Sequence, residues 1–268
     1  MSIVLVTAIF AALLALVLGV ALGFFREFFA VEQDPLTALI REALPGANCG
    51  ACGFPGCDGY AQAAASGQAG TGACSVGGKA VAEKIAALIG KDADAVKPVI
   101  MVLACQGSGE HAPLKGEYTG IPSCRGAKLS AGGTKLCAWG CLGFGDCAAV
   151  CKFGALSMGE DGLPKIDREK CTGCKLCAAE CPQRLLLETP KDLEGAMARC
   201  SNRNPVKSMV IKTCKKGCIK CELCVKNCPE QCIVMDNGIP SVDYGKCAAC
   251  GICAEKCPTK VISLRAVS

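Results

Sequence analysis

The chain has 268 residues, of which 25 are cysteine, and its formal net charge is +5. An ordinary cytosolic enzyme does not contain so many thiols unless they have a function. The odd cysteine count and the chain length also do not suit a small disulfide-bonded secreted domain. The positive charge could indicate nucleic-acid binding. Aromatic residues make up only 4%, however, and the lysines are interleaved with the cysteines. We therefore interpret the basic residues as compensation for anionic metal centres and predict no nucleic-acid partner.

The first segment, residues 1–26, is predicted to be a transmembrane anchor. No charged residue precedes Arg26, and an apolar run of this length can span the hydrocarbon core as a helix. A cleaved signal peptide is the alternative, but it would carry a basic residue ahead of a shorter apolar run. Arg26 and Arg41 follow the helix, and reduced cysteines need a reducing compartment. We therefore expect the rest of the chain on the cytoplasmic side of the cell membrane.

Residues 32–92 are predicted to form a small module around a first metal centre. Asp34 and Pro35 are typical of a helix start, and Gly90 is typical of the end of a helix predicted over 79–90. Four cysteines lie between the helices, separated by glycines that allow a tight wrap. They could hold zinc, but they are also a complete ligand set for one [4Fe–4S] cluster, which the rest of the chain favours. The predicted ligands of cluster 1 are Cys49, Cys52, Cys57 and Cys74.

The second half of the chain carries the bacterial ferredoxin run C-x2-C-x2-C-x3-C-P three times, beginning at Cys171, Cys218 and Cys247. In a two-cluster ferredoxin, the fourth cysteine of each run ligates the other cluster of the pair. Zinc sites favour separated C-x-x-C pairs instead. The triple spacing therefore predicts iron–sulfur clusters held by crossed ligation.

A unit of about 76 residues is duplicated, and this repeat recovers a fourth, distorted copy of the run between Cys137 and Cys151. Phe144 stands where the second unit has Cys221, and Cys137 is predicted to replace the missing ligand. The predicted ligands are Cys137, Cys141, Cys147 and Cys181 for cluster 2; Cys171, Cys174, Cys177 and Cys151 for cluster 3; Cys218, Cys221, Cys224 and Cys257 for cluster 4; and Cys247, Cys250, Cys253 and Cys228 for cluster 5.

Five cysteines remain outside these sets, namely Cys105, Cys124, Cys200, Cys214 and Cys232. The first four could hold a sixth cluster, because Cys124 and Cys200 recur at the repeat period. The alternative is that they are small buried residues or loose thiols. We therefore predict five [4Fe–4S] clusters, with a sixth as an open alternative.

The predicted fold class is α+β, with a transmembrane anchor, the four-Cys module and two tandem ferredoxin-like modules over 131–190 and 209–268. Residues 93–130 are predicted as a buried strand in PVIMVLA and a Gly-rich connector, with loop over 106–133, and 191–208 as a second connector. No Walker A motif and no dinucleotide fingerprint in a strand–helix context is present in the sequence. We therefore predict no flavin or nucleotide on this chain.

The order of these parts resembles the RnfB family, one of the subunits of the Rnf ion-translocating oxidoreductase complex, over nearly the whole chain. The segments LPGANCGACGFPGCDGYA, GCLGFGDC and GCIKCELCVKNCP are similar to motifs of that family. The sequence departs from the family pattern at Lys152, where Pro is expected, and in the stretched spacing from Cys137 to Cys147. The resemblance implies a membrane complex whose other subunits carry flavin and NAD sites. It also implies electron transfer from reduced ferredoxin, coupled to Na⁺ or H⁺ movement.

Lysines surround the fourth predicted cluster, and we hypothesise that they dock an acidic ferredoxin by electrostatic steering. The candidate docking residues are Lys212, Lys215, Lys216, Lys220 and Lys226. The alternative is that they only compensate the charge of the clusters. Three other functions stay open at this point: a membrane polyferredoxin of a hydrogenase or dehydrogenase complex, an Rsx-type reducer of a redox-sensing regulator, and a structural zinc protein.

Overall fold

The computed structural model describes residues 2–28, 34–192 and 195–264. Met1 of the predicted anchor, two residues of the 191–208 connector and the last four residues of the 209–268 module lie outside the described residues. The elements are α1 (Ser2–Phe28), α2 (Pro35–Ala43), α3 (Cys57–Ala65), α4 (Gly78–Ile89), β1 (Val99–Leu103), α5 (Cys124–Ala131), α6 (Asp146–Ala149), β2 (Leu156–Met158), β3 (Pro164–Ile166), α7 (Leu176–Glu180), β4 (Leu186–Pro190), β5 (Met197–Ala198), α8 (Lys207–Thr213), α9 (Leu223–Lys226), β6 (Ile233–Asp236), β7 (Ile239–Val242), α10 (Ile252–Glu255) and β8 (Ile262–Ser263).

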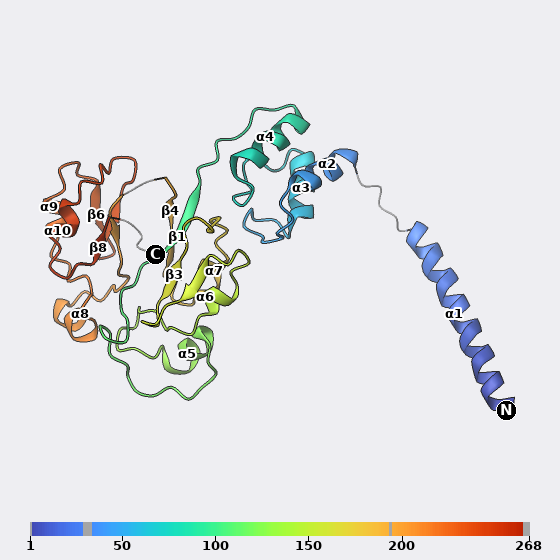
Figure 1. Cartoon of the computed structure of the whole chain (residues 1–268), viewed down its shortest axis with the longest axis horizontal. Coiled ribbons are helices and arrows are strands. Elements are labelled where there is room, and N and C mark those ends of the chain that lie inside the picture. The colour runs from blue at the N-terminus through green and yellow to red at the C-terminus, as the bar shows by residue number, and fades with distance from the viewer. Residues whose placement is uncertain (1, 29–33, 193–194, 265–268) are drawn as a thin grey trace.

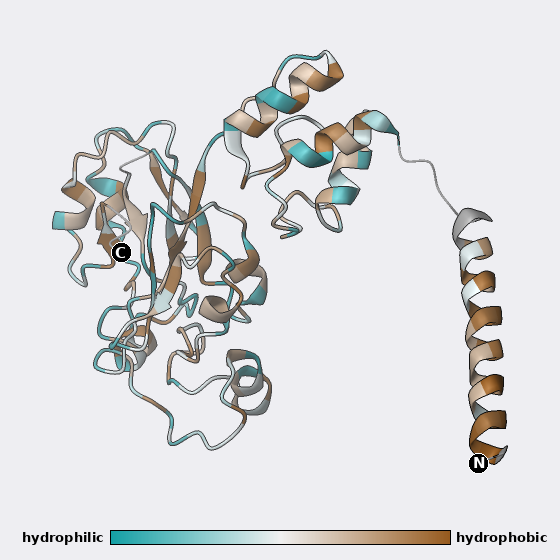
Figure 2. Cartoon of the chain, turned by 45° about the vertical axis from the view of Figure 1, so that its right-hand side comes forward, coloured by the Kyte–Doolittle hydropathy of each residue, from teal (hydrophilic) through white to brown (hydrophobic). Residues whose placement is uncertain are grey.

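Helix α1 is long and apolar enough to cross a membrane over Ile3–Phe25. Its apolar side chains are exposed around the whole helix, and Figure 2 shows hydrophobic residues along its length. A helix that is apolar on every side and packs against no protein core is typical of a membrane span. The Arg26 side chain, on which the expected orientation partly rests, lies outside the described side chains.

Helices α2, α3 and α4 pack into one small module around Ile40, Tyr60 and Ile85, which are almost completely buried. As predicted, the Asp34 carboxylate caps α2 by accepting a 3.0 Å hydrogen bond from the Leu36 amide, and Gly90 ends α4 in a left-handed conformation. The three helices hold the loop that carries the first cysteine cluster.

The rest of the described chain forms two modules of identical topology, shown side by side in Figure 1. In the first, β1 pairs with β4 and the hairpin β2–β3 lies between them in sequence; in the second, β5 pairs with β8 around the hairpin β6–β7. All four pairs are antiparallel. Short helices α6 and α7 correspond to α9 and α10. The two modules are therefore the two copies of the duplicated unit.

The strand pairs also fix which cysteines are equivalent. Just after β1, the Ala104 amide donates to the Leu185 carbonyl at 2.8 Å, and just after β5, the Arg199 amide donates to the Val261 carbonyl at 2.8 Å. Cys105 therefore corresponds to Cys200, whereas the sequence period alone pairs Cys200 with Cys124. The difference arises because the first unit contains an insertion after Cys105.

This insertion is not all loop, although its glycines predict one. Helix α5 forms within it, because the Ser123 hydroxyl accepts a 3.0 Å hydrogen bond from the Gly126 amide at the start and Gly132 adopts φ +62° at the end. Both capping residues are visible in the sequence, but the segment between them is too polar to stand out as an amphipathic helix.

Strand β1 joins the two modules through its two faces. Met101 and Leu103 face the core of the first module, whereas Ile100 and Val102 pack with Met197 of β5. The Ser201 hydroxyl adds a 3.1 Å hydrogen bond to the Ala104 carbonyl. The segments that follow β1 and β5 are thereby held close together, and each of them carries a cysteine.

Candidate metal centres

The four cysteines of the first module line one pocket, as a single cluster requires. Cys57 lies at the start of α3, and its amide donates to the Asn48 side chain at 2.8 Å. The Gly77 amide donates to the Cys74 sulfur at 3.3 Å. Burial raises the pKa of the Cys74 thiol, and the neighbouring thiols of Cys49, Cys52 and Cys57 raise it further. The structure thus brings together all four predicted ligands, Cys49, Cys52, Cys57 and Cys74.

The second dicluster module repeats this arrangement. One pocket is lined by all four cysteines predicted for cluster 4, namely Cys218, Cys221, Cys224 and Cys257. The Val261 amide donates to the Cys257 sulfur at 3.3 Å, so this sulfur receives the kind of N–H contact that stabilises a ligating thiolate. The crossed contribution of Cys257 is explained by the fold, because the segment after α10 returns beside α9.

The sets predicted for clusters 3 and 5 are also brought together. Burial raises the pKa of the Cys177 thiol to about 12, and the nearby thiols of Cys174, Cys171, Cys147 and Cys151 add to the rise. In the fifth set, burial raises the pKa of the Cys253 thiol, with additional effects from the thiols of Cys247, Cys250 and Cys228. Cys250 is the one exposed cysteine of the chain, so this set lies nearest to solvent.

The second predicted set differs from its expectation at one position. The pocket beside Cys141, Cys147 and Cys181 is lined by Cys124, and Cys137 is not among its lining residues. Burial raises the pKa of the Cys147 thiol to about 11, and the thiol that adds most to this rise is Cys124, followed by Cys181. The sequence assigned this position to Cys137, the first cysteine of the distorted run, because Phe144 left a ligand missing. The structure instead brings Cys124 to it from the insertion.

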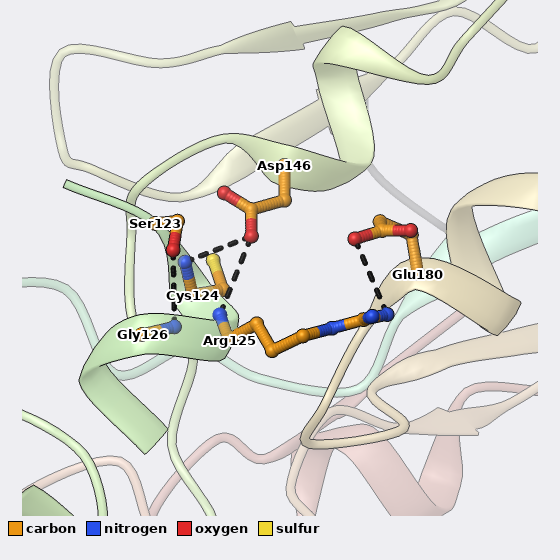
Figure 3. A network of polar contacts seen from close by, with 6 residues as sticks. All are labelled: Ser123, Cys124, Arg125, Gly126, Asp146 and Glu180. Carbon is orange, nitrogen blue, oxygen red and sulfur yellow. Dashed lines mark hydrogen bonds and ion pairs between the residues drawn. The ribbon is translucent and has the colours of Figure 1, made fainter. Parts of the chain in front are cut away.

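The N-terminus of α5 is held by α6, which carries Cys147, and by α7, which is followed directly by Cys181 (Figure 3). Asp146, next to Cys147 on α6, accepts hydrogen bonds from the amides of Cys124 at 2.9 Å and Arg125 at 3.4 Å. The Arg125 guanidinium forms a 3.5 Å ion pair with Glu180 on α7. These contacts hold Cys124 at the pocket, where it supplies a fourth thiol in place of the cysteine that Phe144 replaces in the run.

Four of the five leftover cysteines are buried, but they do not group as the sequence suggested. Cys124 joins the second set, while Cys137 lies near Cys105 and Cys200 and accepts a 3.5 Å contact from the Asn202 amide group. Cys232 lies against Cys228, with the two sulfurs 3.4 Å apart. The signal that could have identified Cys124 was the gap at Phe144, combined with the helix caps around the insertion.

The first module contacts the first dicluster module through Lys152. Its ammonium group donates to the carbonyls of Ala47 at 3.1 Å and Asn48 at 3.3 Å. Burial raises the pKa of the Cys174 thiol, and the Cys49 thiol raises it further, so the two sulfurs interact across the contact. The sequence departure at Lys152 therefore has a structural role, because it fixes the loop of the first cysteine set beside the third set.

Each set of thiols is suited to a multinuclear group. The four-thiol pockets with N–H donors to sulfur match the ligation of iron–sulfur clusters, which are wider than one zinc ion.

Two family models match three segments of the chain. A putative Fe-S cluster family matches residues 44–76, and a 4Fe-4S dicluster domain family matches residues 136–185 and 217–261. The RnfB protein of the Na⁺-translocating ferredoxin:NAD⁺ oxidoreductase complex of Acetobacterium woodii is 43% identical over 87% of this chain and 69% of its own length. The chain belongs to the RnfB family. The corresponding protein of the proton-translocating ferredoxin:NAD⁺ oxidoreductase complex of Clostridium ljungdahlii is 39% identical over 93% of the chain and 87% of its length.

A third member, from the ion-translocating oxidoreductase complex of Methanosarcina acetivorans, is 38% identical over 94% of the chain and 95% of its length. The Rnf-type chain is accordingly an electron-transfer subunit with several [4Fe–4S] clusters, and it is a member of a multi-subunit, membrane-associated complex. The resemblance inferred from the motifs is confirmed.

The candidate docking lysines are divided between surface and interior. Lys212, Lys215 and Lys226 are exposed and Lys216 is half-buried, and none of these four forms an ion pair with a residue in the described part of the chain. The half-buried Lys220 donates to the Asn204 carbonyl instead. Lys220 is therefore a structural cation beside the fourth set.

Proposed function

We propose that this chain takes electrons from reduced ferredoxin on the cytoplasmic side of the membrane and relays them towards the NAD-reducing subunits of an Rnf-type complex. The complex as a whole would couple this transfer to Na⁺ or H⁺ movement, as the names of its relatives indicate. The chain itself supplies thiol sets and an anchor, so its part is electron transfer, and the bond-forming chemistry belongs to other subunits.

The observation that carries this proposal is the arrangement of the thiol sets in a row. The first set is next to the third through Cys49 and Cys174, and the third is next to the second through Cys177 and Cys147. A [4Fe–4S] group accepts and releases one electron at a time. A row of such sites inside one chain supports transfer over a distance that no single site covers.

We propose five ligand sets for these clusters. They are Cys49, Cys52, Cys57 and Cys74; Cys124, Cys141, Cys147 and Cys181; Cys151, Cys171, Cys174 and Cys177; Cys218, Cys221, Cys224 and Cys257; and Cys228, Cys247, Cys250 and Cys253. Four sets are those that the sequence predicts. In the second set Cys124 takes the position first given to Cys137.

The relay is tested by mixing the full chain, purified anaerobically in detergent, with reduced ferredoxin in a stopped-flow instrument. We expect the iron–sulfur absorbance of the chain to bleach as ferredoxin is oxidised. A chain that dithionite bleaches but reduced ferredoxin leaves unchanged would contradict the proposed donor. Reduction of the clusters by ferredoxin, without onward electron transfer when the other subunits are absent, agrees with the proposal.

The docking surface for ferredoxin is proposed on α8 and the loop after it. Val206, Met209 and Ile211 are exposed apolar side chains on or next to this helix, and Lys212 and Lys215 are exposed beside them. An apolar centre with a basic rim is the kind of surface that an acidic electron carrier recognises, because charge steers the encounter and apolar contact holds it.

Charge reversal tests this surface. Lys212→Glu/Lys215→Glu should slow reduction by ferredoxin by about tenfold at low salt, with the difference shrinking as salt screens the charges. The matched control is Lys79→Glu/Lys84→Glu on α4, which changes the net charge equally at exposed positions of another module. Equal rates for the docking variant and the control would place the ferredoxin contact elsewhere.

Sidedness is tested with vesicles. We expect protease to cleave the region after residue 34 in inverted membrane vesicles and to leave it intact in sealed cells from which only the wall has been removed. Cleavage in the sealed cells but not in the inverted vesicles would show that the region after residue 34 lies on the opposite side of the membrane.

A further inference from the structure

Four buried thiols outside the five sets meet between the two dicluster modules. Cys105, Cys137, Cys200 and Cys214 are each less than a tenth exposed. The sulfurs of Cys105 and Cys214 lie 3.5 Å and 3.8 Å from the point where a side chain would begin at Gly107. The Cys214 thiol interacts with the thiols of Cys105, Cys137 and Cys200 in that order. One small volume therefore contains all four sulfurs.

The hydrogen bonds to these sulfurs follow the duplication. The Cys105 sulfur accepts from the Gly107 amide at 3.3 Å and the Cys141 amide at 3.4 Å. The Cys200 sulfur accepts from the Asn202 amide at 3.4 Å and the Cys218 amide at 3.3 Å. Each sulfur thus has equivalent donors in the two units, one amide two residues later and one amide on Cys141 or on its equivalent Cys218. Buried thiols that only fill space have no need of paired N–H donors.

Buried and half-buried cations around the four thiols provide an independent indication of an anionic group. The Lys135 side chain is 5% exposed, and its ammonium donates to the Gly107 carbonyl. No carboxylate among the described residues forms an ion pair with it. Two half-buried cations lie beside the same thiols, Arg199 near Cys105 and Lys220 near Cys200. Buried charges are costly unless an opposite charge compensates them, and a cluster bound by four thiolates carries negative charge.

We propose that Cys105, Cys137, Cys200 and Cys214 hold a sixth [4Fe–4S] cluster between the two modules. Each copy of the duplicated unit contributes two thiols. The set differs from the one that the sequence suggested, because Cys137 replaces Cys124 in it.

The position of this site suits it to pass electrons between the two modules, a role that rests on the proposed relay. Without it, the row of the first three sets and the pair formed by the fourth and fifth sets are separate. Cys105 contacts the amide of Cys141 in the second set, and Cys200 contacts the amide of Cys218 in the fourth. The sixth site therefore joins the two halves into one row, with the first set at one end and the fifth, at exposed Cys250, at the other.

Metal analysis of the anaerobically purified, fully loaded full chain tests the site without any substitution. We expect about 24 iron atoms per chain, all with the Mössbauer signature of [4Fe–4S] clusters, and no zinc. About 20 iron atoms with no further metal would overturn the proposal, and so would about 20 iron atoms with one zinc ion, because zinc would then occupy the four thiols.

Two variants identify the ligands. Cys137→Ala/Cys214→Ala should lose about four iron atoms, whereas the matched control Cys232→Ala should lose none, since the first unit has Ala155 at the equivalent position. If the double variant does not fold, Cys137→Ser provides the second measurement, because a serine oxygen retains a cluster and changes the EPR spectrum of that centre alone. An unchanged iron count and an unchanged spectrum would overturn the assignment.

These readouts separate the site from the relay. A full complement of six clusters in a chain that ferredoxin does not reduce would refute the proposed donor while leaving the sixth site intact. Five clusters in a chain that ferredoxin reduces would refute the sixth site while leaving the donor intact.

Discussion

Replacing Asp146 by alanine should detach the start of α5 from the second thiol set. The Asp146 carboxylate accepts a part-buried 2.9 Å hydrogen bond from the Cys124 amide and a longer, exposed one from Arg125. A hydrogen bond to a charged group contributes about 1.5–3 kcal/mol. The exposed bond adds little, so we expect a loss at the lower end, about 1.5 kcal/mol. Local opening of α5 should therefore become about tenfold more frequent.

Hydrogen exchange of the loaded chain measures this opening directly. We expect amides over 126–131 to exchange about tenfold faster in Asp146→Ala, and an intermediate change in Asp146→Asn, which keeps an acceptor oxygen. The control is Asp58→Ala, which removes an exposed ion pair with Arg41 in another module. Unchanged exchange in α5, together with unchanged loss of iron to a chelator, would refute the reasoning that Asp146 holds Cys124 in place.

Three further predictions concern the contact of Lys152, the buried hydroxyl of Tyr60 and the removal of iron. Lys152→Met should weaken the contact between the first module and the third thiol set by about 1 kcal/mol, since its two hydrogen bonds are exposed; unchanged hydrogen exchange over 45–50 would contradict this. Tyr60→Phe leaves two carbonyls without their hydroxyl donor, so the free energy of unfolding of the first module should fall by about 1–3 kcal/mol. Protease should then cleave within residues 34–92 at a lower urea concentration than in the wild type. Burial raises the pKa of Tyr60 to about 12, so the folded module keeps this hydroxyl protonated above pH 10, where the unfolded chain releases the proton. The wild-type module therefore loses stability as pH rises from about 10 towards 12, and the difference in unfolding free energy between wild type and Tyr60→Phe should become smaller over this range. Iron removal should abolish cooperative melting of residues 130–268, as circular dichroism would show; a sharp transition in the apo chain would contradict it.

The iron dependence has a visible cause in the two dicluster cores. The buried cluster of the first module has four cysteines beside seven large apolar side chains, and that of the second has twice as many cysteines as large aliphatic side chains. Thiols without metal contribute little more than small apolar groups. The strands are also short and paired only two by two, an arrangement that is marginal without further support. Metal therefore takes the place of much of the core.

Sequence reasoning reaches furthest where the information is local. A run such as the one from Cys218 to Cys228 predicts three sulfurs around one site by spacing alone, and the crossed fourth ligand is predicted from the pairing of runs. The helix caps at Asp34 and Gly90 are equally local, because the residues that satisfy the helix end lie within one turn of it.

Sequence reasoning failed where an insertion changes the spacing between equivalent residues of the two units. The distance in sequence between Cys124 and Cys200 equals the repeat period, but the strand pairs show that Cys105 is the true equivalent of Cys200. Cys137 is close in sequence to the second set and yet lies at another site. Sequence separation does not report which side of a loop a thiol faces, and only the tertiary contacts of α5 and β1 decide it.

The charge of the chain also changes meaning once its clusters are included. The formal net charge of +5 counts free thiols as neutral, whereas each [4Fe–4S] group with four thiolates carries about −2 when oxidised, so that the six proposed groups would add about −12. The loaded chain is then anionic overall, and an acidic ferredoxin would be repelled by it at long range. Docking must therefore depend on exposed cations within about one Debye length, about 8–10 Å, of the contact. This is why charge reversal at Lys212 and Lys215 should slow ferredoxin while the same change on α4 should not.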